Sequence, residues 1–179
     1  MIRVTTRRGC AALLFSALIA CDQVLPQRQD LTLPSADEVQ QVYAARGVDA
    51  QATLNGNVVE LRATQDAAQL QRGGSLWARL GPYIYVFSPG TQDVFQRWAG
   101  VAGVRAITVT DAGEEIGRAL LTRDQLNDIT WRRTLNLLGT ALREGTEHPS
   151  RIEELVQWGE ENTQHSYNTD FVPNENGGR

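Results

Sequence analysis

Two tight-turn signals, each lying between strand-like runs, constrain the fold of this chain more than any other feature. The turns are Asn55-Gly56 and Asp111-Ala112-Gly113. Short glycine-containing loops of this kind accept the positive φ angles that join adjacent antiparallel strands. The sequence therefore predicts two β-hairpins. Their strands are expected at residues 49–54 and 57–63, and at residues 104–110 and 114–120.

Helix signals alternate with these hairpins. Ser35 with Glu38, Thr122 with Gln125 and Ser150 with Glu153 each have the spacing of an N-terminal capping box. The glycine pair Gly73-Gly74 weakens one predicted helix, which can break there. A further, central strand is expected at Tyr83–Phe87, because this run is aromatic and β-branched. The predicted helices cover residues 35–47, 66–80, 91–100, 123–144 and 150–162.

The order of these elements predicts an α/β fold of the α+β type. We expect a two-layer sandwich in which helices pack on a mixed sheet that contains two hairpins. Matched positions also relate residues 34–70 to residues 89–129, which indicates an internal repeat. The alternative is that any two helix–hairpin–helix units have Pro and Gly at the same places, where helices and strands begin and end. Both interpretations stay open at this point.

The amino terminus carries the features of an export signal. Residues 1–8 contain three arginines and no acid, and residues 10–20 form an apolar run. This run is too short to span a bilayer, which takes about 20 residues, and is typical of a secretory signal peptide. The motif Leu18-Ile19-Ala20-Cys21 resembles the lipobox of bacterial lipoprotein precursors. The resemblance implies cleavage between Ala20 and Cys21 and attachment of lipid to the Cys21 thiol.

Lipid attachment would divide the chain into an anchor, a tether and a domain. Removing the signal peptide at residues 1–20 also removes Cys10 and three arginines, so the net charge changes from −4 to −7 and no free thiol remains. Residues 21–34 are polar with two prolines and indicate a tether, and residues 35–162 are expected to form a single domain.

A polar tail follows at residues 163–179, and we expect residues 173–179 to be disordered. An aromatic patch interrupts this tail at Tyr167, Phe171 and Val172. Either the tail is disordered, or this patch docks on the domain or on a partner.

Asp22, directly after the lipidated position, resembles a retention signal for the inner membrane. The expected location is therefore the cell envelope, with the domain facing the periplasm or the exterior.

The globular part resembles three families of small α/β modules. One resemblance is confined to residues 47–64, which are similar to lipid-surface BON-type modules. In the predicted order of its elements, residues 57–144 resemble the thioredoxin fold, but the turn at 64–69 has no redox dithiol. The alternative fold is therefore a thioredoxin-like scaffold without redox chemistry. The second half of the chain is also similar to nucleotide-sensing CBS modules, which occur in tandem pairs. That family's ribose-contacting motif is Thr-x-x-Asp, and this sequence has Thr64-x-Asp66 and Thr122-x-Asp124, each one residue shorter.

The two histidines of the chain lie among acidic residues, which suggests one metal-binding site. His148 adjoins Glu147, and Glu161 precedes His165 by four residues, a spacing that would put both on one helix face. The hypothesis is that these four residues form a divalent-metal site. The alternative is that His148 belongs to a loop before a capped helix whose outer face is solvated by glutamates.

The rest of the sequence points away from catalysis. Neither G-x-S-x-G, HExxH, a P-loop nor G-x-G-x-x-G occurs, so no catalytic residue and no cofactor are predicted. The negative net charge argues against nucleic-acid binding, which requires a basic face. Six aromatic side chains are candidates to line a cleft or to fill the core: Trp77, Tyr83, Tyr85, Trp98, Trp131 and Trp158.

We therefore expect a non-catalytic lipoprotein that serves in envelope assembly or binds a ligand beside the membrane. Its expected partners are the bilayer, through acylated Cys21, and an envelope protein. The alternatives are an envelope hydrolase with dispersed carboxylates and the redox-inactive thioredoxin-like scaffold. A cleft that holds two carboxyls would favour the enzyme, and a wide apolar patch on the helical layer would favour a protein partner.

Mass spectrometry of the protein isolated from membranes tests the anchor. The expected amino terminus is an acylated Cys21, because the lipobox places the cleavage site directly before it. An unprocessed amino terminus, or an unacylated residue 21, would contradict this prediction.

Overall fold

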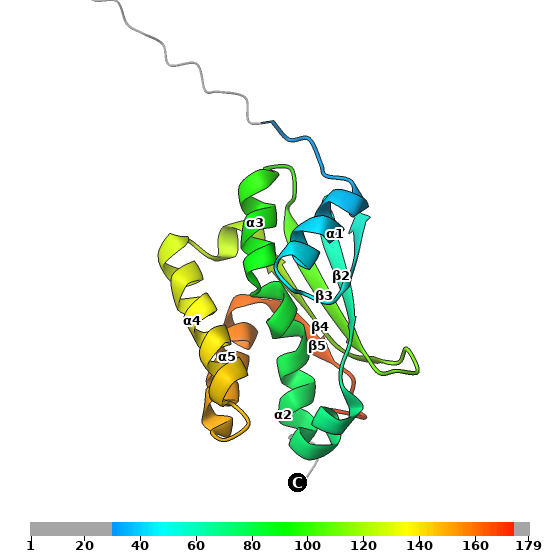
Figure 1. The fold of residues 1–179 in the computed structure, drawn as a ribbon, viewed down its shortest axis with the longest axis vertical. Helices are drawn as coiled ribbons and strands as arrows, with labels where there is room; N and C mark the ends of the chain where they lie inside the picture. Colours follow the sequence, from blue (N-terminus) through cyan, green and yellow to red (C-terminus); the bar gives the residue numbers. More distant parts are fainter. Residues whose placement is uncertain (1–29, 174–179) are drawn as a thin grey trace, which may run out of the picture.

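Within residues 30–173, which the computed structural model describes, five α-helices cover one face of a five-stranded mixed sheet (Figure 1). The α+β sandwich predicted from the sequence is therefore confirmed. The helices are α1 (Ala36–Ala45), α2 (Ala67–Val86), α3 (Pro89–Arg97), α4 (Asp128–Glu144) and α5 (Pro149–Asn162), with a short 3-10 helix η1 (Arg123–Gln125) before α4. The strands are β1 (Gln51–Asn55), β2 (Val58–Thr64), β3 (Gly103–Val109), β4 (Glu115–Thr122) and β5 (Gln164–Tyr167).

The strands lie side by side in the order in which they occur in the chain. Strands β2 and β3 are parallel, and the other three pairings are antiparallel. Both predicted hairpins are present, and Gly56 and Gly113 adopt the expected positive φ angles of 61° and 83°. Because parallel neighbours cannot be joined by a tight turn, the chain crosses from β2 to β3 through α2 and α3.

The core lies between the sheet and the helices. Alternate strand residues point toward the helical layer and are buried, which is the pattern of a sheet covered on one face. Tyr43, Tyr83 and Phe87 are the largest side chains that the helices bury completely. The buried strand residues that face them include Val59, Leu61, Val104, Ala106, Ala119 and Leu121.

The opposite face of the sheet is polar. Glu60 on β2 forms an ion pair with Arg105 on β3 at 2.5 Å, and Glu115 pairs with Arg118 along β4 at 2.6 Å. Arg62 donates a hydrogen bond to the carbonyl oxygen of Gly113 at 3.0 Å. Charged neighbours across the strands keep this face hydrated.

A side chain from α1 protects the edge of the sheet at β1. The amide nitrogen of Gln40 donates to the carbonyl of Ala50 at 2.9 Å, and its amide oxygen accepts from the N–H of Ala52 at 2.7 Å. The side chain thus occupies backbone groups that a further strand would use. Blocking an exposed edge in this way limits pairing with other chains.

One of the three predicted capping boxes is present. Ser35 and Glu38 bond reciprocally at the start of α1. The box at Thr122 was wrong because the buried Leu126 adopts an extended conformation and separates η1 from α4, which Asn127 caps instead. The box at Ser150 was also wrong, since α5 begins one residue earlier, at Pro149, and has no side-chain cap.

The strand predicted at Tyr83–Phe87 was wrong, because Tyr83–Val86 form the last turn of α2 and Phe87 is its C-cap residue. Leu76, Leu80, Tyr83 and Phe87 recur every three or four residues, and the last three are buried on one helix face. Packing of this face against β3 and β4 outweighs the strand propensity of the run. The expected break at Gly73-Gly74 is confirmed, since Gly74 has φ 55° and ψ −141° inside α2.

The internal repeat is present as an order of elements but not as a repeated geometry. Helix, hairpin and helix occur twice along the chain. However, β1 and β4 both run antiparallel to the central parallel pair of β2 and β3. Viewed from the helical face, the arrangement of the first hairpin is therefore the mirror image of that of the second. One unit cannot be rotated onto the other with its helices on the same face. The tandem pair that the CBS resemblance implies is therefore not formed.

The thioredoxin-like alternative fails on the same region of the chain. That resemblance required a strand at Tyr83–Phe87 and a sheet order in which this strand takes part. The segment is helical, and β2 and β3 lie next to each other in a sheet that follows chain order.

The sequence did not predict a strand in the polar tail. Residues Gln164–Tyr167 form β5, antiparallel to β4, and Tyr167 packs against the helical layer. Docking of the aromatic patch on the domain is thus confirmed for Tyr167. A four-residue polar strand shows too little alternation to be recognised from sequence.

The predicted signal peptide, Ala20, Cys21 and the tether as far as residue 29 lie outside the described residues, and so do residues 174–179. Among the helices of residues 30–173, none combines the length and apolar character needed to cross a membrane.

Arg123 ties the end of α3 to the sheet. Its guanidinium donates to the backbone carbonyls of Val101 at 2.7 Å, of Phe95 at 2.6 Å and of Trp98, and it lies 5.0 Å from the centre of the Phe95 ring. Burial lowers the pKa of Arg123. One charged side chain thus binds the carbonyls of Phe95 in the last turn of α3, of its C-cap residue Trp98 and of Val101 in the loop that follows.

Replacing Arg123 with Met should lower the free energy of unfolding by about 2–3 kcal/mol, because hydrogen bonds from a charged donor are lost and the carbonyls stay partly buried. Denaturant unfolding of the variant measures this effect. Arg62→Met, which loses one exposed hydrogen bond, is the control and should cost under about 1 kcal/mol. Equal effects of the two substitutions would contradict the assignment.

Candidate ligand pocket

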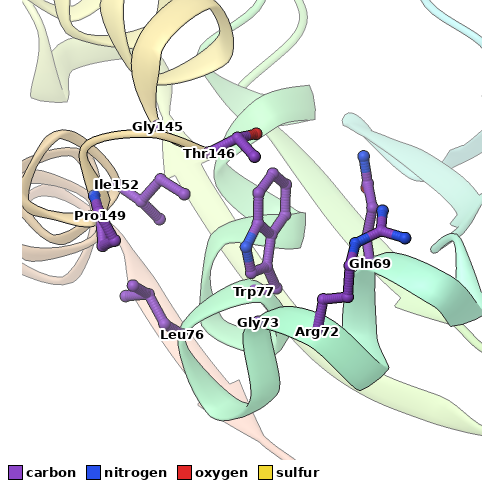
Figure 2. A pocket seen from close by; sticks show the side chains of 9 residues that line it. All are labelled: Gln69, Arg72, Gly73, Leu76, Trp77, Gly145, Thr146, Pro149 and Ile152. Carbon is purple, nitrogen blue, oxygen red and sulfur yellow. The ribbon is translucent and has the colours of Figure 1, made fainter.

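A cavity of about 400 Å³ lies between the first half of α2 and the loop that joins α4 to α5 (Figure 2). Pockets that bind small molecules commonly have volumes of about 300–1,000 Å³. Figure 2 shows the Trp77 ring in the middle, with Pro149 and Ile152 on one side and Gln69 and Arg72 on the other. The complete lining is Gln69, Arg72, Gly73, Leu76, Trp77, Gly145, Thr146, Pro149 and Ile152.

The break in α2 shapes one wall of this cavity. Gly74 adopts a conformation that L side chains avoid, and this redirects the chain between the two halves of the helix. The neighbouring Gly73 lies directly against the indole of Trp77, since a Cβ at position 73 would be 1.3 Å from its Cδ1 atom. The side chain of Trp77 can occupy its place only because residue 73 has none.

A second glycine shapes the opposite wall. A Cβ at Gly145 would lie 2.5 Å from the Cγ1 atom of Ile152 and 2.3 Å from the carbonyl oxygen of Ala141. The turn after α4 therefore packs closely on the first turn of α5. Both walls thus depend on the small size of a glycine.

The lining carries one positive charge and no carboxylate. Arg72 is exposed on α2, and no ion pair or hydrogen bond to its side chain is found within residues 30–173. The N-terminus of α5 also lies at the cavity, without a side-chain cap at His148. Both features favour negative charge at this place.

A second hollow, between α1 and α3, lies at the other end of the domain and differs from this cavity in its charges. The ion pair between Arg46 and Asp93, at 2.7 Å, lies in its lining. These charges already satisfy each other, so the hollow offers less to a ligand than the cavity at Trp77.

The structure does not bring the four predicted metal ligands together. His148 precedes α5 and His165 lies on β5 beyond its end, and the 14 residues of α5 span about 20 Å. Glu161 and His165 do not share a helix face, because α5 ends at Asn162. Glu147 remains beside His148 in the loop. Within residues 30–173, no three His, Cys, Asp or Glu side chains are close enough to hold a metal ion.

The aromatic candidates divide between the core and the cavity. Tyr83 and Trp131 are buried, and Trp77 lines the cavity. Trp158 is half-buried: its indole N–H donates to Thr134 at 2.8 Å, and Arg133 lies 4.3 Å from its ring centre.

A cluster of polar side chains joins α2, α5 and β5 beside the core. Arg79 binds both carboxylate oxygens of Glu160 at 2.7 and 2.8 Å, and the Tyr167 hydroxyl donates to Glu160 at 3.0 Å. The hydroxyls of Tyr167 and Tyr83 are 2.6 Å apart. These groups satisfy one another, so the cluster holds β5 against the helices.

Burial controls the ionisation of this cluster. It raises the pKa of Tyr83 to about 12 and also raises the pKa of Tyr167, whose hydroxyl faces Glu160. Burial alone would lower the pKa of Arg79, but the hydrogen bonds and charge of Glu160 outweigh it and raise that pKa.

Sequence reasoning missed most of the cavity. It identified Trp77 as an aromatic candidate and Gly73-Gly74 as a break, but it did not connect them with Arg72, Gly145 or Thr146. The only signal was the double glycine one turn before a tryptophan. The residues of the α4–α5 loop are about 70 positions away in the chain, and no local pattern joins the two segments.

Comparisons with protein-family models, with curated proteins and with solved structures find no match for this chain.

Alkaline titration tests the polar cluster and the core together. The chain has four tyrosines, and burial is the main cause that raises the pKa of each: Tyr43, Tyr83, Tyr85 and Tyr167. A raised pKa favours the neutral form in the folded state. The resulting stability is complete below the ordinary pKa of 10 and is lost as the pH rises toward the folded value of about 12 for Tyr83.

The unfolding free energy should therefore fall above pH 10, and tyrosinate absorbance should appear only as the domain unfolds. The denatured chain, titrated in parallel, gives the reference near pH 10. A tyrosinate signal centred near pH 10 in a protein with native circular dichroism would contradict the burial of these groups.

Proposed function

We propose that this protein is a bacterial lipoprotein, anchored through acylated Cys21, whose domain binds a small-molecule ligand in the cell envelope without catalysing a reaction. The observation that supports ligand binding is the cavity around Trp77, which has the volume of a small-molecule site and walls of mixed polarity. The anchor is supported by the sequence of residues 18–21.

The position of the cavity suits a tethered binding module. Residues 30–35 enter the domain at one end of its long axis, beside α1 and α3 (Figure 1). The first half of α2 and the α4–α5 loop lie at the opposite end (Figure 1). A domain held at its entry end would therefore present the cavity away from the bilayer, where soluble molecules reach it.

The exposed surface gives less support to a role in envelope assembly. The large apolar side chains with the greatest exposure on α4, Ile129 at 70% and Leu142 at 54%, are 13 residues apart, or about 20 Å along the helix. Leu31 and Leu33 lie on the segment before α1. Scattered single residues of this kind do not make the contiguous patch that a stable protein partner needs.

The lining of the cavity also gives less support to a hydrolase. Hydrolysis of glycosidic bonds uses two carboxyl groups that face each other across the substrate. The cavity lining contains neither Asp nor Glu. Binding without chemistry is the simpler use of this set of side chains.

Ligand extraction tests the proposal. The full-length protein is isolated from its membrane in mild detergent and denatured, and the released small molecules are identified by liquid chromatography and mass spectrometry. We expect a compound that co-purifies with the wild type and is lost from Gly73→Ala, because the added methyl group would displace the Trp77 ring.

Gly139→Ala is the matched control. Gly139 lies inside α4, where a Cβ would meet only the mobile end of Arg143, at 3.1 Å. This variant should keep the compound and gain about 0.5–1 kcal/mol of stability, as expected when Ala replaces Gly in a helix. Recovery of the same compounds from both variants, or of none from the wild type, would contradict the proposed function.

A further inference from the structure

We infer that the ligand is a small anion with an apolar ring or short chain, whose acidic group binds Arg72 while its apolar part packs on Trp77. This inference rests on the proposed function and adds the chemical class of the ligand. It is carried by the separation of polar and apolar side chains on the two sides of the cavity.

The charge of the lining differs from that of the whole protein. Acidic residues outnumber basic ones in this chain by 21 to 17, yet the lining has one guanidinium and no carboxylate. Within residues 30–173, most other arginines near the sheet or core already have a carboxylate or carbonyl partner, such as Arg79 with Glu160 and Arg123 with Val101. No such partner is found for Arg72 in this part of the chain.

Neutral donors lie near this guanidinium. Figure 2 shows the side chains of Gln69 and Arg72 next to each other on the same side of the Trp77 ring, with Thr146 near the ring edge. Within residues 30–173, no hydrogen bond to the side-chain amide of Gln69 is found, so this amide can donate to a ligand. A guanidinium flanked by an amide matches the oxygens of a carboxylate or a phosphate.

The other side of the cavity is apolar. The apolar side chains of Leu76, Pro149 and Ile152 lie around the indole of Trp77. A flat ring or a short chain placed there would remove apolar surface from water, and aromatic rings gain further from stacking. A ligand without the anionic group would leave the charge of Arg72 unpaired. An ion without the apolar part would leave the apolar side of the cavity exposed to water.

Two probes of the same shape separate charge from shape. The anion 1-naphthaleneacetate and its neutral amide, 1-naphthaleneacetamide, carry the same two-ring system. Each is titrated calorimetrically into the full-length lipidated protein in mild detergent, with a titration into detergent alone subtracted. We expect the anion to bind at least about tenfold more tightly than the amide, a difference of about 1.4 kcal/mol.

Three variants assign this preference. Arg72→Gln should lower the affinity for the anion about tenfold or more and leave the amide within about threefold, because it removes the charge alone. Trp77→Ala should weaken both probes. Arg132→Gln, which removes an exposed guanidinium on α4, should change neither.

The outcomes separate the two claims. If both probes bind equally and depend on Trp77, or if Arg72→Gln leaves the anion unaffected, the ligand class is overturned while the binding function stands. If neither probe depends on Trp77, the proposed function of the cavity fails together with the ligand class.

Discussion

The parallel pairing of β2 with β3 sets the positions of the other elements. Parallel neighbours need a long crossover, and the chain supplies it with α2 and α3, which return along one face of the sheet. Helix α2 consequently lies at the centre of the helical layer and contacts β3, β4 and α5. Its second half and its C-cap residue place Tyr83 and Phe87 in the core, where burial of their apolar surface stabilises the fold.

One helix thus serves both the core and the candidate pocket. The break at Gly74 allows the half of α2 before it to take a different direction from the half that packs on the sheet. Trp77 lies just after the break, against Gly73, and faces the loop between α4 and α5. The core can therefore be tightly packed while the end of the same helix contributes to a cavity. The charge of Arg72 and the apolar side chains of α5 then give this cavity two chemically distinct sides.

Local signals in the sequence predicted the parts of the fold that depend on local physics. The hairpins follow from glycines that accept positive φ, and the start of α1 follows from the reciprocal bonds of Ser35 and Glu38. The run at Tyr83–Phe87 was assigned incorrectly because a short apolar run suits a buried strand and a buried helix equally well, and only its partners decide. The cavity could not be predicted, because it forms where two segments far apart in the sequence meet.

Amide hydrogen exchange along α2 is the most direct test of the claim that a break in this helix creates the cavity. If the helix is interrupted at Gly74, the amides of Ser75 and Leu76 have no acceptor in the preceding turn and should exchange rapidly. The amides of residues 83–86, in the buried second half, should exchange slowly. Continuous protection of the amides from residue 71 through residue 81, the last before Pro82, would mean a helix unbroken at Gly74 and would contradict this account of the cavity.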